Sequence, residues 1–237
     1  MGLFSRKKKV SPEEERALEE NRAKLDSFQV TKAWGIKKYG PAMQFIYDEN
    51  AKQFVVVEGP EETFRERNPF IVGFDQVKDV ILEVEENWQR EPGEFQPKGY
   101  GNLLQEDYKN VYWRYDFWLT IKTDHPFAGE IRYQMNFKPT ITKVPQRGIM
   151  FRRGFGIGGT YRGEQIREMA AKLEQMGSGE EQKIKLGRAV DVVTLNVPDS
   201  IAEGVKERFE DDKYLKKIDN MAAHVKRAGR ISKLLLG

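Results

Sequence analysis

The chain has 237 residues, of which 39% are hydrophobic and 11% aromatic, so it can build a core and is not disordered as a whole. It contains no cysteine, which excludes disulfides, thiolate metal sites and thiol catalysis. Its formal net charge of +3 is too small to indicate a nucleic-acid binder by itself.

The N-terminal segment predicts a basic tail followed by a helix. Residues 1–9 lack the apolar core of a signal peptide, and no window approaches the length of a membrane span, so we expect a soluble cytoplasmic protein. Ser11 suits the N-cap position and Pro12 the first helical position. The apolar stripe of this helix, which includes Leu25 and Phe28, is thin and predicts weak docking or a surface position.

The pattern changes to strands from about residue 43. In residues 43–58, two apolar runs flank the polar stretch DENAK, which predicts a hairpin. A turn at Gly73–Gln76 leads into an alternating strand, and residues 89–110 predict a long loop because they hold Pro and Gly. The apolar face of the alternating strand is made by Val80, Leu82 and Val84.

The clearest antiparallel pair lies at residues 111–124 and 129–138, which alternate on either side of a turn with Pro126. The apolar face of the first strand holds Tyr115, Phe117, Leu119 and Ile121. Trp118 lies on the opposite face, where a terminal helix of this chain, the long loop or a partner must cover its ring. Residues 139–160 are glycine-rich and predict irregular structure.

Two helical regions are predicted in the C-terminal part. Residues 163–177 repeat apolar residues at helical spacing and end at a glycine. Residues 198–236 predict a further helical region with a break near Asp211, and its last part has an apolar side and a basic side. Three kinds of cover for the apolar side remain open: docking or self-association, a partner protein, and an anionic membrane surface.

Three segments stand in the order FIYDENAKQFVV, PFIVGFDQVKDVILEVEEN and YDFWLTIKTDHPFAGEIRYQMN, and YRGEQIREMAAKL follows them. Their telling residues are Phe74, Asp75 and Val77, then Asp124, His125 and Pro126 before Ile131 and Arg132. Together, over residues 40–175, they resemble an uncharacterised family of bacterial proteins with a pleckstrin-homology-like domain. The resemblance implies a curved antiparallel sheet capped by a C-terminal helix, and it implies no known activity. A zinc-binding cysteine module often precedes the domain in that family, and this chain lacks the cysteines for it.

A glycine-rich loop precedes the first of the two C-terminal helical regions. Gly154, Gly156 and Gly159 match the spacing G-x-G-x-x-G, but a dinucleotide site also needs a strand running straight into the glycines within a βαβ unit. Because the upstream sequence predicts antiparallel strands, we interpret the loop as a flexible linker. Its arginines leave an anion site at the following helix start open. These arginines are Arg147, Arg152, Arg153 and Arg162.

The sequence shows no catalytic constellation. His125 and His224 have neither a second histidine nor a carboxylate pair at metal-ligand spacing, so we expect structural or surface roles for both. Nucleophile-elbow, zinc-protease and Walker motifs do not occur. We therefore expect no enzymatic activity, cofactor, metal or nucleic-acid partner.

These observations predict an α+β fold: a strongly bent antiparallel sheet or barrel, PH-like, capped by a helix, with helical extensions at both ends. The predicted division is a basic tail and helix over 1–30, the β domain over 40–177, and a helical extension over 178–237. The predicted function is a non-enzymatic interaction or adaptor module that binds a protein partner or self-associates. The alternative is a peripheral binder of an anionic membrane surface or anionic ligand. The candidate contact residues are Arg147, Arg152, Arg153, Arg162, Lys226, Arg227, Arg230 and Trp118.

Overall fold

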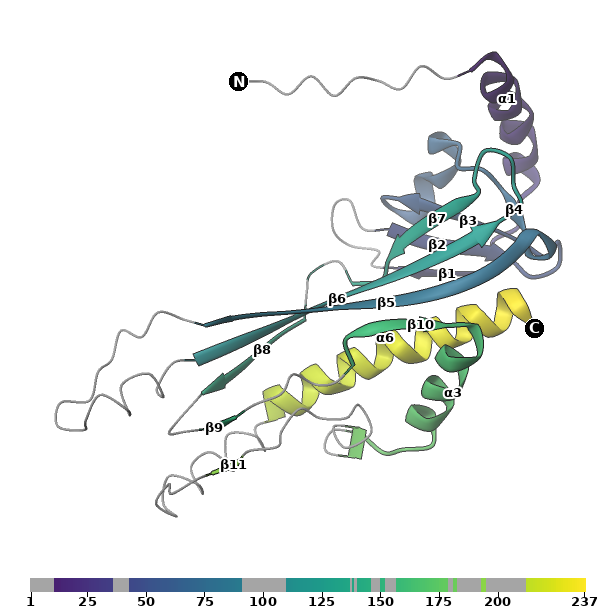
Figure 1. Ribbon diagram of the computed structural model, residues 1–237. Coiled ribbons are helices and arrows are strands. Elements are labelled where there is room, and N and C mark those ends of the chain that lie inside the picture. Colours follow the sequence, from purple (N-terminus) through teal and green to yellow (C-terminus); the bar gives the residue numbers. More distant parts are fainter. Residues whose placement is uncertain are drawn as a thin grey trace, which may run out of the picture. The chain divides into compact units, whose positions relative to one another are not determined.

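The structure is a computed structural model whose described residues are 11–35, 43–90, 110–136, 138, 140–145, 150–151, 157–178, 181–182, 193–194 and 212–237. It is an α+β fold of antiparallel sheets and helices (Figure 1). The labelled helices are α1 (Pro12–Ser27), α3 (Gly163–Glu174) and α6 (Asp212–Leu236), and the 3-10 turns are η1 (Glu61–Arg67) and η2 (Phe74–Gln76). The strands are β1 (Lys32–Gly35), β2 (Met43–Asp48), β3 (Gln53–Glu58), β4 (Val72–Gly73), β5 (Val77–Arg90), β6 (Asn110–Thr123), β7 (Glu130–Gln134), β8 (Thr140–Pro145), β9 (Met150–Phe151), β10 (Gly159–Arg162) and β11 (Val193–Thr194).

The two larger sheets are open. One has the order β1-β2-β3-β4, the other has the order β10-β5-β6-β7 with β8 also paired to β6, and β9 and β11 form a small third sheet. A barrel closes only when the two end strands of a sheet pair with each other. Among the described residues this pairing is found neither between β1 and β4 nor between β10 and β7. The predicted α+β class and antiparallel pairing are confirmed, and of the predicted alternatives, sheet or barrel, the structure shows open sheets.

The chain divides into two compact units. Unit 1 comprises Met1–Lys78 and Ile121–Tyr133, and unit 2 comprises Asp79–Thr120 and Gln134–Gly237. The sheet of β1 to β4 and helix α1 therefore belong to unit 1, and α3 and α6 to unit 2. The three domain boundaries proposed from composition remain a prediction.

Helix α1 packs into the core of unit 1. Its predicted cap forms, because the Glu14 N–H donates to the Ser11 hydroxyl at 3.1 Å. Leu25 and Phe28 are each 1% exposed, and Phe28 meets the Phe64 ring edge-on at 5.7 Å. The same cluster of buried residues includes Ile46, Val55 and Val57. The C-terminal part of the thin apolar stripe is therefore fully buried, whereas Ala17 and Leu18 are only partly buried. The prediction of weak docking is wrong for this end of the helix.

The Arg65 side chain caps the C-terminal end of α1. Its Nε donates to the Leu25 carbonyl at 3.0 Å, and its Nη2 donates to the Phe28 carbonyl at 2.8 Å. A helix leaves its last carbonyls without intrahelical partners, and a cation there also interacts favourably with the helix dipole. Arg65 thereby joins η1 to α1 within unit 1.

Helix α6 packs against α3 in unit 2 (Figure 1). The apolar side of α6 is buried within the described chain through Ile218, Met221, Ala222, Val225, Ala228, Ile231 and Leu235. At the crossing, a Cβ placed on Gly229 would lie 2.3 Å from the Ala170 Cβ, so the two helices meet too closely there for a side chain. Of the three kinds of cover left open for this helix, the structure shows docking on its own chain.

The strands of the sheets follow the sequence pattern in most places. The predicted hairpin is β2 and β3, paired from Met43 with Glu58 to Asp48 with Gln53. The predicted long loop lies mainly outside the described residues. The region predicted to be irregular contains β8, which pairs with β6 from Tyr115 with Thr140 to Asn110 with Pro145, so that prediction is wrong there. The 14-residue strand β6 is long enough to offer this second partner beyond its pairing with β7.

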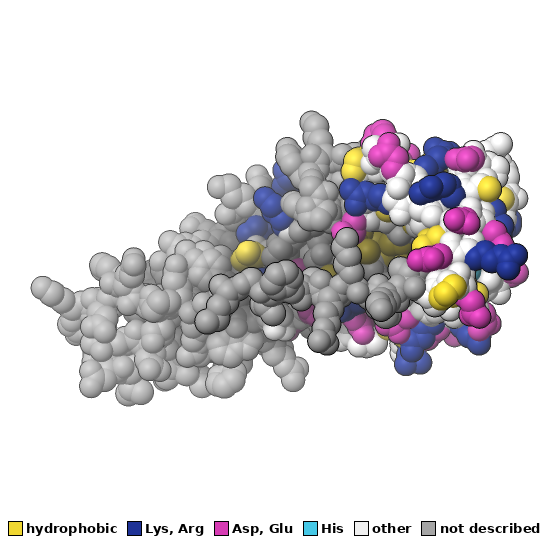
Figure 2. Space-filling model, turned by 90° about the horizontal axis from the view of Figure 1, so that it is seen from above, with side chains coloured by type: hydrophobic (Ala, Val, Ile, Leu, Met, Phe, Trp, Pro, Cys, Tyr) yellow, Lys and Arg dark blue, Asp and Glu magenta, His cyan; other side chains and the backbone are white. Residues whose placement is uncertain are grey.

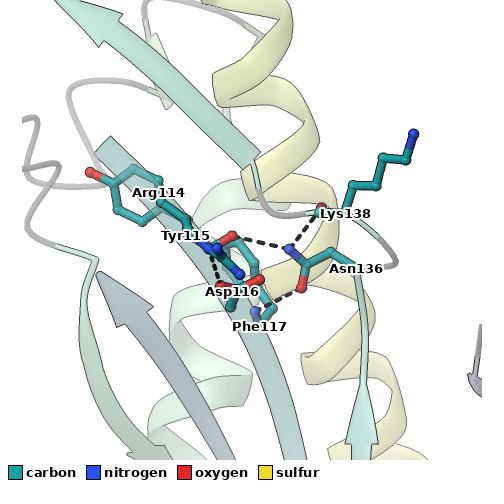
Figure 3. A network of polar contacts seen from close by, with 6 residues as sticks. All are labelled: Arg114, Tyr115, Asp116, Phe117, Asn136 and Lys138. Atoms are coloured by element: carbon teal, nitrogen blue, oxygen red, sulfur yellow. Dashed lines mark hydrogen bonds and ion pairs between the residues drawn. The ribbon is translucent and has the colours of Figure 1, made fainter. Parts of the chain in front are cut away.

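The side chain of Asn136 bridges β6 to the segment that leads into β8 (Figure 3). Its Oδ1 accepts the Phe117 N–H at 2.8 Å, and its Nδ2 donates to the Tyr115 and Lys138 carbonyls at 3.0 and 3.1 Å. The amide is buried, so it substitutes for backbone pairing where the ladder between strands ends. Asn136 is therefore a structural residue that permits the change of strand partner.

Candidate functional site

A pocket of about 380 Å³ lies in unit 1. Four segments that are distant in sequence form it: one side of α1, the start of β3, the stretch from Phe70 to Gln76, and the turn between β6 and β7. The lining residues are Ala17, Glu20, Asn21, Lys24, Gln53, Phe70, Ile71, Gly73, Gln76, His125, Pro126 and Phe127. We call this site the aromatic pocket.

Three rings in contact form one wall of the aromatic pocket. The Phe70 ring stacks on Phe127 with centroids 5.6 Å apart and planes 19° apart, and it also meets the His125 ring at 5.3 Å. Phe127 is 36% exposed, which makes it one of the two exposed large apolar side chains among the described residues. The wall is thus an apolar surface that remains open to solvent and to an incoming side chain.

Asn21 fixes α1 against the stretch that presents Phe70. Its Nδ2 donates to the Asn68 side-chain oxygen at 3.0 Å and to the Pro69 carbonyl at 2.7 Å, and its Oδ1 accepts the Ile71 N–H at 3.0 Å. Asn68 adopts a left-handed backbone conformation with φ of 50°. Because the Asn21 amide is 4% exposed and hydrogen-bonded through both its ends, its role is to position the wall and not to bind a ligand.

Hydrogen bonds brace the turn that carries His125. The Thr123 hydroxyl donates to the Ala128 carbonyl at 2.7 Å and accepts the His125 N–H at 3.0 Å. The Phe127 N–H donates to His125 Nδ1 at 3.3 Å. Since Nδ1 acts as the acceptor, the proton of the neutral imidazole is on Nε2, and this N–H is left to donate.

The surroundings of His125 favour its neutral form. Burial lowers the pKa of His125, and the nearby Lys24 ammonium lowers that pKa further. A carboxylate partner would act in the opposite direction, because it stabilises the charged imidazolium. Glu20 is the single carboxylate among the lining residues, and it is not among the causes of this shift.

The predicted contact residues that the structure describes are not among the lining residues of the aromatic pocket. Arg147, Arg152 and Arg153 lie outside the described residues. In unit 2, Arg162 forms an ion pair with Asp79 at 3.7 Å, and Arg230 forms one with Glu174 at 3.0 Å. Lys226 and Arg227 are partly exposed on α6, and Trp118 is partly buried on β6.

The structure also places part of the glycine loop. Gly154 and Gly156 lie outside the described residues, whereas Gly159 begins β10 with φ of 143°. Strand β10 pairs antiparallel with β5 and leads directly into α3. A dinucleotide fingerprint belongs to a parallel βαβ unit, so this antiparallel setting does not match it.

The visible charged surface mixes both signs. In the view of Figure 2, the Lys and Arg side chains of the described residues are interspersed with Asp and Glu side chains over the surface that faces the viewer. Exposed ion pairs such as those of Arg162 and Arg230 reduce the positive field that a membrane-binding surface needs. No helix of the described part of the chain is long and apolar enough to cross a membrane.

Neither metal ligands nor known relatives point to an activity. Within the ranges that the structure describes, no three His, Asp or Glu side chains gather as metal ligands would. Comparisons with protein-family models, curated proteins and solved structures find no match to this chain. The interpretation of the aromatic pocket therefore rests on its own chemistry.

Sequence reasoning missed most of the aromatic pocket. The sequence places His125 and Pro126 in a turn but predicts a structural or surface role for His125, and it indicates no binding role for Phe70, Phe127 or Lys24. The one signal available was Phe127, which follows His125 and Pro126 in the predicted turn. An apolar ring in a turn is not part of the apolar face of a strand.

Proposed function

We propose that this chain is a non-enzymatic interaction module, with a PH-like β domain, that binds a segment of a partner protein in the aromatic pocket. One observation carries the proposal: a pocket of about 380 Å³ has a wall of three contacting rings, and its only histidine is paired with a backbone N–H. Concave sites with an apolar wall and a few polar groups are typical of binding sites. The pocket lining contains no serine, threonine or aspartate to act as a nucleophile or second acid.

The alternative, a binder of anionic membranes, has less support. An interfacial helix needs an apolar face that can enter the lipid boundary. Most of the apolar side of α6 is buried within unit 2, so it offers no broad apolar face for such a surface. Charge alone, without a burying face, gives weak and salt-sensitive attachment.

The proposal is tested by selecting binders from a random peptide library displayed on phage with the full chain as bait. Recovered peptides are measured against the wild-type chain, Phe127→Ser and Ile141→Ser. The last variant is a matched control, because Ile141 is the other exposed large apolar side chain and does not line the pocket. We expect Phe127→Ser to weaken binding by about tenfold or more, since the loss of a central aromatic anchor costs at least about 1.4 kcal/mol.

Either of two results would contradict the proposal. The first is the recovery of no peptide that the wild-type chain binds. The second is peptide binding that survives Phe127→Ser as well as it survives Ile141→Ser, because the binding surface would then lie elsewhere. Concentration-dependent sedimentation of the same proteins separates a partner segment from a second copy of this chain as the occupant.

A further inference from the structure

The apolar half of the aromatic pocket sets one requirement on its occupant. Phe70 and Phe127 stack with each other at 5.6 Å, and Ile71 and Pro126 complete the apolar lining. A side chain that lies on this surface removes apolar area from water on both sides. An aromatic or large aliphatic side chain meets this requirement best, because it presents a flat or broad surface to the rings.

The charge at the aromatic pocket sets a second requirement. Two charged residues line it, Glu20 and Lys24. Arg16 lies 3.7 Å from Glu20 in an ion pair, whereas Lys24 has no ion-pair partner within the described ranges of the chain. The field that reaches His125 agrees with this count, since the charge that perturbs the histidine is the Lys24 ammonium and not a carboxylate. Together with Arg16, which pairs with Glu20 but does not line the pocket, the charges on this side of α1 are two positive and one negative, an excess of one positive charge.

The hydrogen-bonding groups point in the same direction. His125 uses Nδ1 as an acceptor within its own turn and has its Nε2–H left to donate. The Gln76 Oε1 accepts the Gly73 N–H at 2.9 Å, which leaves the Gln76 amide nitrogen as a donor. With Lys24, three donors thus line the site, and an occupant with acceptors complements them.

We infer that the partner segment recognised by the aromatic pocket carries an acidic side chain adjacent to an aromatic or large aliphatic one. This inference rests on the proposed function and names the chemistry of the partner. The rings take the apolar side chain, and Lys24 with the donors beside it takes the carboxylate. Charge-assisted hydrogen bonds to a carboxylate are the stronger kind, so the acidic residue supplies the specificity.

The inference is tested with fluorescein-labelled, capped pentapeptides that contain one Trp next to Glu, and with matched peptides that have Gln or Lys in place of Glu. Fluorescence polarisation is measured with the full chain at low and high salt. We expect the Glu peptides to bind about two to five times more tightly than the Gln peptides at low salt, the range of exposed ion pairs. This preference shrinks at high salt because exposed charges are screened.

Two variants test whether Lys24 causes the preference for Glu peptides. Lys24→Gln removes the preference for Glu, and Lys24→Glu reverses it in favour of the Lys peptides. Arg22→Gln is the matched control, because it removes the same charge from an exposed position of α1 that does not line the pocket. Thermal unfolding of each variant verifies the fold.

The outcomes separate the inference from the proposed function. If Glu and Gln peptides bind equally and both lose affinity in Phe127→Ser, the inference is overturned and the proposed function stands. If no peptide of any charge binds in a manner that depends on Phe127, both are overturned. A preference for Glu that Lys24→Gln and Arg22→Gln reduce equally is an effect of net charge, and it also overturns the inference.

Discussion

We expect His224 on α6 to lower the stability of this protein in mild acid. Its ring lies 5.0 Å from the Phe117 ring, and its Nδ1 is buried with no hydrogen-bond partner in the described chain. Burial lowers the pKa of His224, and the positive charge of Arg227 lowers it further, from 6.5 to about 4. The two causes act in the same direction, because desolvation and a neighbouring positive charge each disfavour the charged imidazolium.

The direction and size of the effect follow from linkage. Between pH 6.5 and about 4 the unfolded chain binds a proton at His224 that the folded chain does not, so stability is complete above 6.5 and declines as the pH falls toward 4. One pKa unit corresponds to about 1.4 kcal/mol. Across this window the folded state loses about 3 kcal/mol, a large part of the 5–15 kcal/mol of a typical domain.

The substitution that tests this reasoning is His224→Leu, which keeps an apolar side chain beside Phe117 and removes the titrating group. Urea unfolding followed by tryptophan fluorescence is measured at pH 7.5 and pH 4.5 for the wild-type chain and the variant. We expect the wild-type chain to lose about 2–3 kcal/mol more than His224→Leu between the two pH values. His125→Leu is the control, because it removes the other histidine of the chain from a partly exposed turn and leaves most of the pH dependence in place.

Equal pH dependence in the wild-type chain and His224→Leu would refute the reasoning. So would an NMR titration of the folded protein in which the His224 imidazole protonates near its ordinary pKa of 6.5.

Two further substitutions test the packing described above. Gly229→Ala replaces glycine by a better helix former, but its Cβ would lie 2.3 Å from the Ala170 Cβ, so we expect a net loss of about 1–2 kcal/mol in the free energy of unfolding measured with urea. The double variant with Ala170→Gly should restore stability. A single variant that is more stable than the wild-type chain would contradict the close crossing of α3 and α6. Asn21→Ala removes three hydrogen bonds and should lower the free energy of unfolding by about 2–3 kcal/mol in the same measurement. The control Asn50→Ala, at an exposed position, should change it little. Similar losses for both variants would show that Asn21 does not hold the wall of the aromatic pocket.

Much of the secondary structure was predictable because its causes are local. Ser11 accepts the Glu14 N–H three residues away, and α1 begins where that cap predicts. The hairpin of β2 and β3 follows from two apolar runs around a short polar stretch, because the partner strands are neighbours in sequence. Helix α3 likewise follows from the apolar spacing of Ile166 and Leu173, both buried.

The aromatic pocket was not predictable in this way, because its walls meet only after folding. The hydrogen bonds that join Asn21 to Asn68 and Pro69 span 47 and 48 residues of sequence. No periodicity over such a distance tells which side chain of α1 will face Phe70 or His125. The positions of Lys24 and Phe127 at one site therefore had to be read from the structure.

From its amino-acid sequence alone, this protein could be assigned its antiparallel strands, its capped first helix and the two-sided character of its last helix. These features depend on spacing, capping and turn residues, which act within a few positions of the chain. Only the tertiary structure decided that the sheets stay open, that β6 takes β8 as a further partner, and that the apolar side of α6 is buried in unit 2. Those outcomes depend on which distant surfaces fit each other, since the same apolar stripe can be buried by any surface of matching shape.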